Sequence, residues 1–122
     1  MSSIMVINAK GGSGKTTIST NLASYFASNG YKVTLVDLDP QGSSTKWLSS
    51  RPITKAKIKG VTSLPPQKVS KKEDEVTIFD VPAAIYGARL QTYIKKAVKI
   101  IVPVLPSPID MSAARDFLNS IR

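Results

Sequence analysis

The sequence predicts an α/β fold built on a parallel β-sheet. Along its 122 residues, short and nearly continuous apolar runs alternate with stretches that carry apolar residues at helical spacing, a pattern typical of βαβ units. Continuous apolar runs are typical of strands that helices cover on both faces. A glycine-rich loop joins the first apolar run to the first helical stretch. We therefore expect the loop-bearing strand near the centre of the sheet, with helices on both faces.

The glycine-rich loop resembles a phosphate-binding loop in its residue types. Residues 10–17 read K-G-G-S-G-K-T-T, after a predicted strand at Ser2–Asn8 and before a predicted helix at Lys15–Ser28. Phosphate-binding loops follow the pattern G-x-x-x-x-G-K-[ST], and Ala9 stands where the leading glycine of that pattern would fall. The alternative is a flexible Gly/Ser linker, which the flanking strand and helix disfavour.

The chemistry of this loop suits a nucleoside triphosphate with a metal ion. Glycines let backbone N–H groups point at phosphate oxygens, and the following helix N-terminus adds positive potential. Lys15 is expected to contact the β- and γ-phosphates, the Thr16 hydroxyl to bind Mg²⁺, and Thr17 to lie near the α-phosphate. The residues expected to bind phosphate are Lys10, Gly11, Gly12, Ser13, Gly14, Lys15, Thr16 and Thr17.

The first helix leads into a second buried strand. Apolar residues recur every four positions along Lys15–Ser28 and are expected to form its core-facing stripe: Ile18, Leu22 and Phe26. Asn29 and Gly30 are expected to end the helix. An apolar run at Lys32–Leu38 predicts the next strand, and a strand–helix–strand unit with a short return predicts parallel pairing with a right-handed crossover.

Two carboxylates stand at the end of the second predicted strand. Asp37 and Asp39 open the run D-L-D-P-Q-G-S, and alternation along an extended segment puts both on one side. Ligands bind at the carboxyl ends of parallel strands in such sheets. The alternative is a capped turn, since aspartate, proline and glycine are all turn residues.

A third aspartate follows another apolar run. Val76–Asp80 reads as a strand that ends in a carboxylate and leads into Val81-Pro82-Ala83. This is the Walker B pattern, in which the aspartate holds Mg²⁺. We therefore expect Thr16 and Asp80 at the metal, with Asp37 supporting the metal shell.

The remaining elements are predicted from shorter patterns. We expect a short helix at Ser43–Ser50, an edge strand at Ile58–Val61, a helix at Ala88–Lys96 and a fifth strand at Ile100–Leu105. In the Ala88–Lys96 region, the residues expected to face inward are Leu90, Ile94 and Ala97. Asp110 is expected to cap a last helix, with an inward row of Met111, Ala114, Leu118 and Ile121.

Composition excludes several classes of site. The chain has no cysteine and no histidine, so disulfides, thiolate or imidazole metal sites and histidine-based triads are excluded. The N-terminus has no basic segment followed by a long apolar stretch, so we expect no secretory signal, no membrane span and a cytoplasmic location.

The net charge is strongly positive and locally concentrated. The formal net charge is +9, and eight of the 17 basic residues lie in the stretch from Lys46 to Lys72, which has no acidic residue. They are Lys46, Arg51, Lys55, Lys57, Lys59, Lys68, Lys71 and Lys72. Such a segment fits an anionic partner, such as nucleic acid or a membrane surface, and equally fits a solubilising face. Trp47 is the single tryptophan, so no interleaved aromatic residues indicate base stacking.

The motifs together resemble those of the ParA/MinD family of P-loop ATPases. K-G-G-x-G-K-[ST] is similar to the family's deviant Walker A box, and D-x-D-P-Q-G-S to its first switch region. The resemblance implies a SIMIBI-type sheet of order 3-2-4-1-5, and a catalytic Lys10 that reaches phosphates bound by the other subunit of a dimer. It also implies that Asp39 positions the attacking water, which would make Lys10, Lys15 and Asp39 the catalytic set. Ala83 stands where many members have a second proline.

The resemblance implies an ATPase that positions DNA or a large protein cargo, such as a plasmid, a chromosome or a carboxysome. It implies ATP and Mg²⁺ as cofactors, a homodimer formed on ATP binding, nonspecific DNA on the nucleoid, and a ParB-like or cargo adaptor protein. Residues 1–122 would form one partial domain, with the C-terminal part of the family fold missing. The alternatives are a MinD-like membrane-associated ATPase, for which the last predicted helix has little basic character, and a truncated, non-catalytic nucleotide-binding module.

Overall fold

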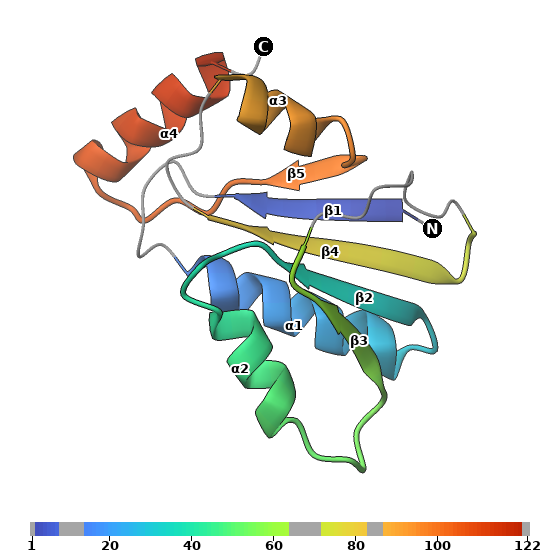
Figure 1. The fold of residues 1–122 in the computed structure, drawn as a ribbon. Coiled ribbons are helices and arrows are strands. Elements are labelled where there is room, and N and C mark those ends of the chain that lie inside the picture. The colour runs from blue at the N-terminus through green and yellow to red at the C-terminus, as the bar shows by residue number, and fades with distance from the viewer. Residues whose placement is uncertain (1, 8–13, 64–71, 83–86, 121–122) are drawn as a thin grey trace.

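A computed structural model describes residues 2–7, 14–63, 72–82 and 87–120 of the chain. Strands and helices alternate along most of it (Figure 1). The elements are β1 (Ser2–Ile7), α1 (Lys15–Ser28), β2 (Lys32–Asp37), α2 (Ser43–Ser50), β3 (Ile58–Val61), β4 (Glu75–Val81), α3 (Gly87–Ile94), β5 (Lys99–Ile101) and α4 (Pro108–Ser120). The predicted α/β class is confirmed.

The five strands form one sheet in the order β3-β2-β4-β1-β5, and every pair is parallel. This is the order that the family resemblance implies. β1, which leads into the glycine-rich loop, lies between β4 and β5, and β4 is central. All strand arrows point the same way in Figure 1, so the carboxyl ends of β1, β2 and β4 lie at one edge of the sheet, where parallel α/β sheets bind ligands.

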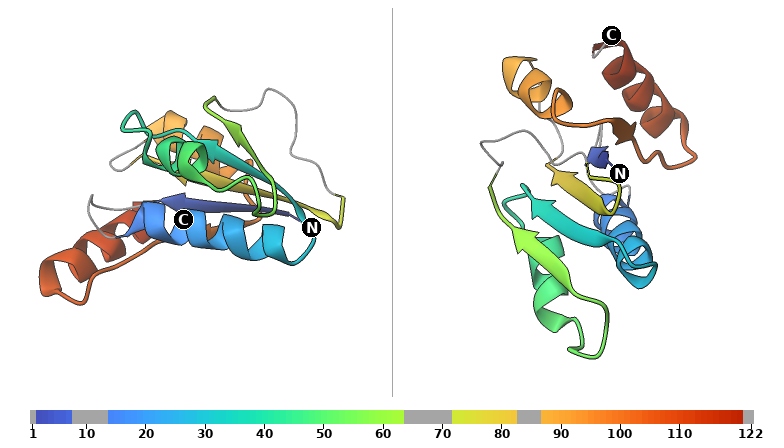
Figure 2. Two further views of the ribbon diagram at one scale, coloured as in Figure 1. Left: turned by 90° about the horizontal axis from the view of Figure 1, so that it is seen from below. Right: turned by 90° about the vertical axis from the view of Figure 1, so that its right-hand side faces the viewer.

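One face of the sheet packs against α1 and α2. Both helices lie on the same side of the strands in Figure 2, α1 along the sheet and α2 beside β3. The buried residues of this layer are Ile4, Val6, Ala23, Ala27, Val33, Leu35, Val76 and Ile78. Gly60 in β3 allows α2 to approach closely, because a Cβ at this position would lie 2.8 Å from Leu48 Cδ1.

The residues predicted to face the core in α1 do pack against it, but they are not the most buried residues of the helix. Its fully buried positions include the small residues Ser19, Ala23 and Ala27, rather than the predicted row. Ile18, Leu22 and Phe26 are half-buried and pack against the flank of the same cluster. Small side chains let the helix backbone lie close to the sheet, so the larger apolar residues fill the space at the sides.

A second apolar cluster lies on the opposite sheet face and toward β5. Met5, Ile7, Val36, Phe79 and Val81 supply the strand residues, and Tyr93 of α3 and Phe117 of α4 join them. Ile94 and Ala97 pack against this cluster as expected, whereas the side chain of Leu90 lies outside the described set. In α4 the buried residues are Ala114 and Phe117, while Met111 and Leu118 are exposed. The predicted inward row is therefore confirmed at Ala114 and wrong at Met111 and Leu118, and its last member, Ile121, lies outside the described residues.

The last helix begins earlier than predicted. α4 starts at Pro108, which places Asp110 inside its first turn rather than at its cap. Ser107 is the residue before the helix, and its Oγ accepts a hydrogen bond from the Asp110 backbone N–H at 3.2 Å while donating to the Asp110 carboxylate. A serine before a proline at the first helical position is a common helix start. β5 is also shorter than predicted and ends at Ile101.

Within the described residues, none of the helices combines the length and the apolar character needed to cross a membrane.

Candidate functional site

The candidate site lies where α1 begins beside the carboxyl ends of β1, β2 and β4. Asp37 is the last residue of β2 and pairs in register with Asp80 of β4, and Ile7 of β1 pairs with Val81. Gly14 precedes α1 with φ 85°, a left-handed conformation that favours glycine. The chain therefore turns sharply into α1 and directs the next residue, Lys15, toward the strand ends.

Lys15 is the centre of the site. Its side chain is 6% exposed, although lysine is almost never buried unless it is paired. Nζ forms an ion pair with Asp80 Oδ1 and lies 3.1 Å from Asp39 Oδ2. Three of the residues singled out in the sequence, from α1, β4 and the segment after β2, thus lie together at one ammonium group.

Asp80 is completely buried, and both of its carboxylate oxygens have partners. Oδ1 accepts from Lys15, and Oδ2 accepts from the hydroxyl of Ser44 at 2.5 Å. A buried carboxylate is costly unless it is paired and hydrogen-bonded. Lys15 and Ser44 together satisfy that requirement.

Asp37 is held by the first turn of α2. Its Oδ2 accepts hydrogen bonds from the backbone N–H and the Oγ1 hydroxyl of Thr45, each at 2.8 Å, and its Oδ1 accepts from the Asp39 backbone N–H at 3.1 Å. The Asp37 carboxylate is 4% exposed. These bonds fix both the start of α2 and the backbone of the segment that carries Asp39.

Asp39 is the most accessible of the three carboxylates, at 19% exposure. Burial acts to raise its pKa, but the hydrogen bond from the Gln41 backbone N–H and the neighbouring Lys15 ammonium outweigh burial, so the pKa of Asp39 lies below its ordinary value. The group is therefore an anion at neutral pH. It lines an open cavity of about 440 Å³ with residues of the same segment and of α2, including Gly42 and Lys46.

The structure describes only part of the predicted phosphate loop. Lys10, Gly11, Gly12 and Ser13 lie outside the described residues. Thr16 is half-buried and Thr17 is exposed, both in the first turn of α1. Ser44 and Thr45 were not among the residues predicted from the sequence. Their contacts with Asp80 and Asp37 depend on how α2 packs, and no local sequence motif marks either residue.

The donor set fits a phosphate ligand with Mg²⁺. A buried lysine at a helix N-terminus suits phosphate oxygens, and the carboxylate oxygens of Asp80 and Asp39 beside it suit a hard cation. Among the described residues, no three histidine, cysteine, aspartate or glutamate side chains are grouped so that they could hold a metal by themselves. Mg²⁺ in phosphate sites commonly takes one or two protein ligands, with phosphates and water completing its shell.

Comparison with known proteins identifies the family. A family model described as an AAA domain matches residues 1–122. The chain is 31% identical to maintenance of carboxysome distribution protein A of Gloeobacter kilaueensis and 32% identical to the protein of that name in Halothiobacillus neapolitanus. These matches cover 89% and 97% of this chain but 51% and 57% of the relatives, so the chain spans about half of their length.

A shorter match of higher identity involves the chromosome-partitioning ATPase Soj of Thermus thermophilus. The two are 56% identical over 48 residues, which cover 39% of this chain and 19% of the relative. Because the family model matches the whole chain and the relatives agree with it, the chain belongs to the ParA/MinD family of P-loop ATPases.

Proposed function

We propose that this protein is a ParA-like ATPase that binds ATP with Mg²⁺, dimerises on binding, and positions or segregates DNA or a large protein cargo. The observation that carries the proposal is the meeting of Lys15 with Asp80 and Asp39 at the start of α1. The names of the relatives support the positioning role, since they refer to carboxysome distribution and chromosome partitioning.

The proposal assigns the following tasks to the residues of the site. Lys10 and the loop from Gly11 to Thr17 hold the phosphates, and Thr16 and Asp80 hold the metal. Asp37 supports that shell indirectly, because its oxygens bind Thr45 and the backbone of Asp39. Mg²⁺, when bound, would neutralise charge that develops on the phosphate oxygens.

Asp39 is the group proposed to orient the attacking water. It is ionised, partly accessible, and lies against Lys15. Phosphoryl transfer needs little covalent chemistry from a protein, so the proposed contribution of these residues is orientation and charge stabilisation. Lys15 changes partners in this scheme, since it must contact phosphate in place of at least one carboxylate.

The proposal also includes the binding partners of the protein. As the family resemblance implies, the protein would act as a homodimer on nonspecific DNA of the nucleoid, in the cytoplasm, together with a ParB-like or cargo adaptor protein.

The deciding experiment is ATP hydrolysis by the purified chain, with and without Mg²⁺ and with and without DNA. We expect Mg²⁺-dependent turnover that DNA alters. Nucleotide binding without any turnover would instead identify a non-catalytic nucleotide-binding module, and absence of binding would refute the proposal for this chain.

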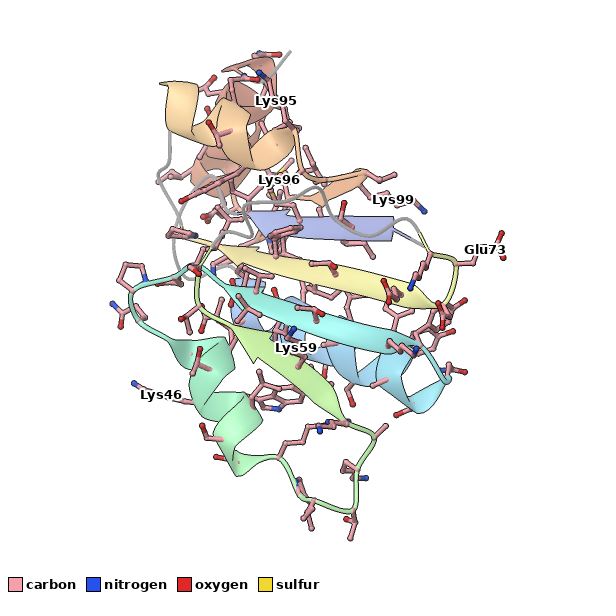
Figure 3. All side chains as sticks on the ribbon, turned by 45° about the vertical axis from the view of Figure 1, so that its right-hand side comes forward. Lys46, Lys59, Glu73, Lys95, Lys96 and Lys99 are labelled. Atoms are coloured by element: carbon pink, nitrogen blue, oxygen red, sulfur yellow. The ribbon has the colours of Figure 1, made fainter. Side chains whose placement is uncertain are left out.

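The basic segment from Lys46 to Lys72 is the proposed contributor to DNA binding, and its part from Lys46 to Lys59 lies within the described residues. Lys46 on α2 and Lys59 on β3 are seen in Figure 3, and Lys55 and Lys57 are exposed in the intervening loop. Arg51 differs, because its guanidinium lies 5.2 Å from the Trp47 ring centroid and donates to the Ala56 carbonyl. The lysines are therefore better placed than Arg51 to meet phosphates.

Changing Lys55, Lys57 and Lys59 to glutamine is expected to weaken binding to duplex DNA uniformly across sequences. The slope of log affinity against log salt should become shallower by about 0.9 for each phosphate that the variant no longer neutralises, and so by about 2 to 3 in all. The measurement is fluorescence anisotropy with labelled DNA and ATP over a salt series.

The matched control changes Lys32, Lys95 and Lys99 to glutamine, which removes the same charge from exposed positions elsewhere. If both triple variants keep the affinity and salt slope of the unchanged protein, the segment is only a solvated face. An equal decrease in affinity in both would point to net charge rather than to this surface.

A further inference from the structure

The first turn of α2 is attached to two acidic strand ends. Ser44 donates from its hydroxyl to Asp80 at the end of β4, and Thr45 binds Asp37 at the end of β2. α2 follows directly on the segment that carries Asp39, and its start is marked by Gly42 with φ 66°. Two adjacent residues of one helix therefore link the Asp39 segment to both strands.

Ser44 is an unusual first-turn serine because it is completely buried. Gly42 occupies the N-cap position, so Ser44 does not cap the helix. Its hydroxyl donates instead to a carboxylate 36 residues away in sequence, and that carboxylate is also completely buried. A helix start needs no such bond, and a buried alanine would fill most of the same space.

The two oxygens of Asp80 have different partners. Oδ1 forms an ion pair with the Lys15 ammonium, while Oδ2 accepts a hydrogen bond from the Ser44 hydroxyl. Lys15 is also the proposed phosphate ligand, so its contact with Asp80 lasts only while Lys15 is not engaged elsewhere. Ser44 has no competing task in the proposed function, and it can hold the orientation of the carboxylate throughout.

We propose that Ser44 is a positioning residue for the metal, acting through Asp80. The inference rests on the proposed function, in which Asp80 helps to hold Mg²⁺. The Ser44 hydroxyl fixes the rotation of the carboxylate so that Oδ1 faces the side of the site where Lys15 lies. Residues that orient metal-binding groups in this way commonly contribute about 10- to 100-fold to metal affinity.

The test is the Mg²⁺ dependence of nucleotide affinity in Ser44→Ala. Binding of a fluorescent ATP analogue is titrated at a series of Mg²⁺ concentrations and without Mg²⁺. We expect affinity without Mg²⁺ to stay within about twofold, because the phosphate-binding groups are intact. The Mg²⁺ concentration that gives half of the full effect should rise about tenfold, and Ser44→Thr, which keeps the hydroxyl, should restore most of it.

Two comparisons separate this role from a general effect on folding. Ser49→Ala is the matched control, because Ser49 is an exposed serine of the same helix whose hydroxyl donates to the Thr45 carbonyl. In an Asp80→Asn background, Ser44→Ala should cause no further change in Mg²⁺ dependence. If Ser44→Ala does not fold, Ser44→Cys keeps the size with a weaker donor and should show a smaller shift in the same direction.

Unchanged Mg²⁺ dependence in folded Ser44→Ala or Ser44→Cys would overturn the inference, as would an equal shift with and without Asp80. If the unchanged protein binds the nucleotide with no response to Mg²⁺, the proposed function itself fails, and that outcome is distinct from the results that would overturn the role of Ser44.

Discussion

Replacing Lys15 with alanine is expected to abolish ATP binding by this protein. Lys15 is the proposed ligand of the β- and γ-phosphates, and hydrogen bonds to charged groups contribute about 1.5 to 3 kcal/mol each. Loss of two such bonds corresponds to at least about a 100-fold loss of affinity, at about 1.4 kcal/mol for each factor of ten. Equilibrium titration with a fluorescent ATP analogue measures the effect directly.

The Lys15 variant also needs a control for folding, because it leaves Asp80 buried without its cation. Removing one partner of a buried ion pair commonly costs about 3 to 5 kcal/mol of stability. The double variant Lys15→Ala with Asp80→Asn removes both charges and separates the two effects. In the absence of Mg²⁺, the double variant should not bind the nucleotide, whereas Asp80→Asn alone, which keeps Lys15, should bind it.

Lys32→Ala is the matched control for loss of a lysine. Lys32 is an exposed residue at the opposite end of β2, 3.8 Å from an Asp74 oxygen, and its replacement should leave nucleotide affinity unchanged. An unchanged affinity in folded Lys15→Ala would remove Lys15 from the phosphate site.

The fold could be predicted from the sequence to a large extent because the buried strands of a parallel sheet are nearly continuous in apolar residues. β1, β2 and β4 follow this rule, and α1 and α2 have the predicted bounds. The strand order came from the resemblance and not from the apolar pattern, which does not specify which strands are neighbours.

The errors in the fold share a cause, which is tertiary packing. The inward face of α1 could not be read from residue size, since close contact with the sheet selects Ser19, Ala23 and Ala27. The start of α4 was misplaced because Asp110 and Ser107 both have the chemistry of a cap, and only the geometry shows that Ser107 accepts the bond.

In the candidate site, Lys15, Asp39 and Asp80 could be identified as candidate residues because each belongs to a motif at a strand end or a helix start. Ser44 and Thr45 could not, since a serine and a threonine in a short polar helix have no distinctive pattern. Their role follows from the position of α2 beside β2, which brings the hydroxyls to Asp80 and Asp37.

Replacing Asp39 with alanine is expected to preserve ATP binding and to remove turnover. Lys15 keeps its ion pair with Asp80 in this variant, so the phosphate-binding side of the site is retained and affinity should change by no more than about threefold. A positioned acid or base commonly contributes about 10²- to 10⁴-fold to rate, so we expect turnover to fall by about 100-fold or more. The measurement is single-turnover ATP hydrolysis beside equilibrium nucleotide binding.

Asp39→Asn tests whether the charge of Asp39 or its shape is required. Asparagine can still accept the Gln41 backbone hydrogen bond, which is 2.9 Å long in this structure, but it cannot supply the anion that the lowered pKa of Asp39 maintains. If orientation of water depends on the carboxylate charge, the asparagine variant should be nearly as slow as alanine, while Asp74→Ala, at an exposed carboxylate far from the site, should be as fast as the unchanged protein. Near-normal turnover in both Asp39 variants would assign the role to another group, with Asp37 the next carboxylate to test because it lines the same cavity.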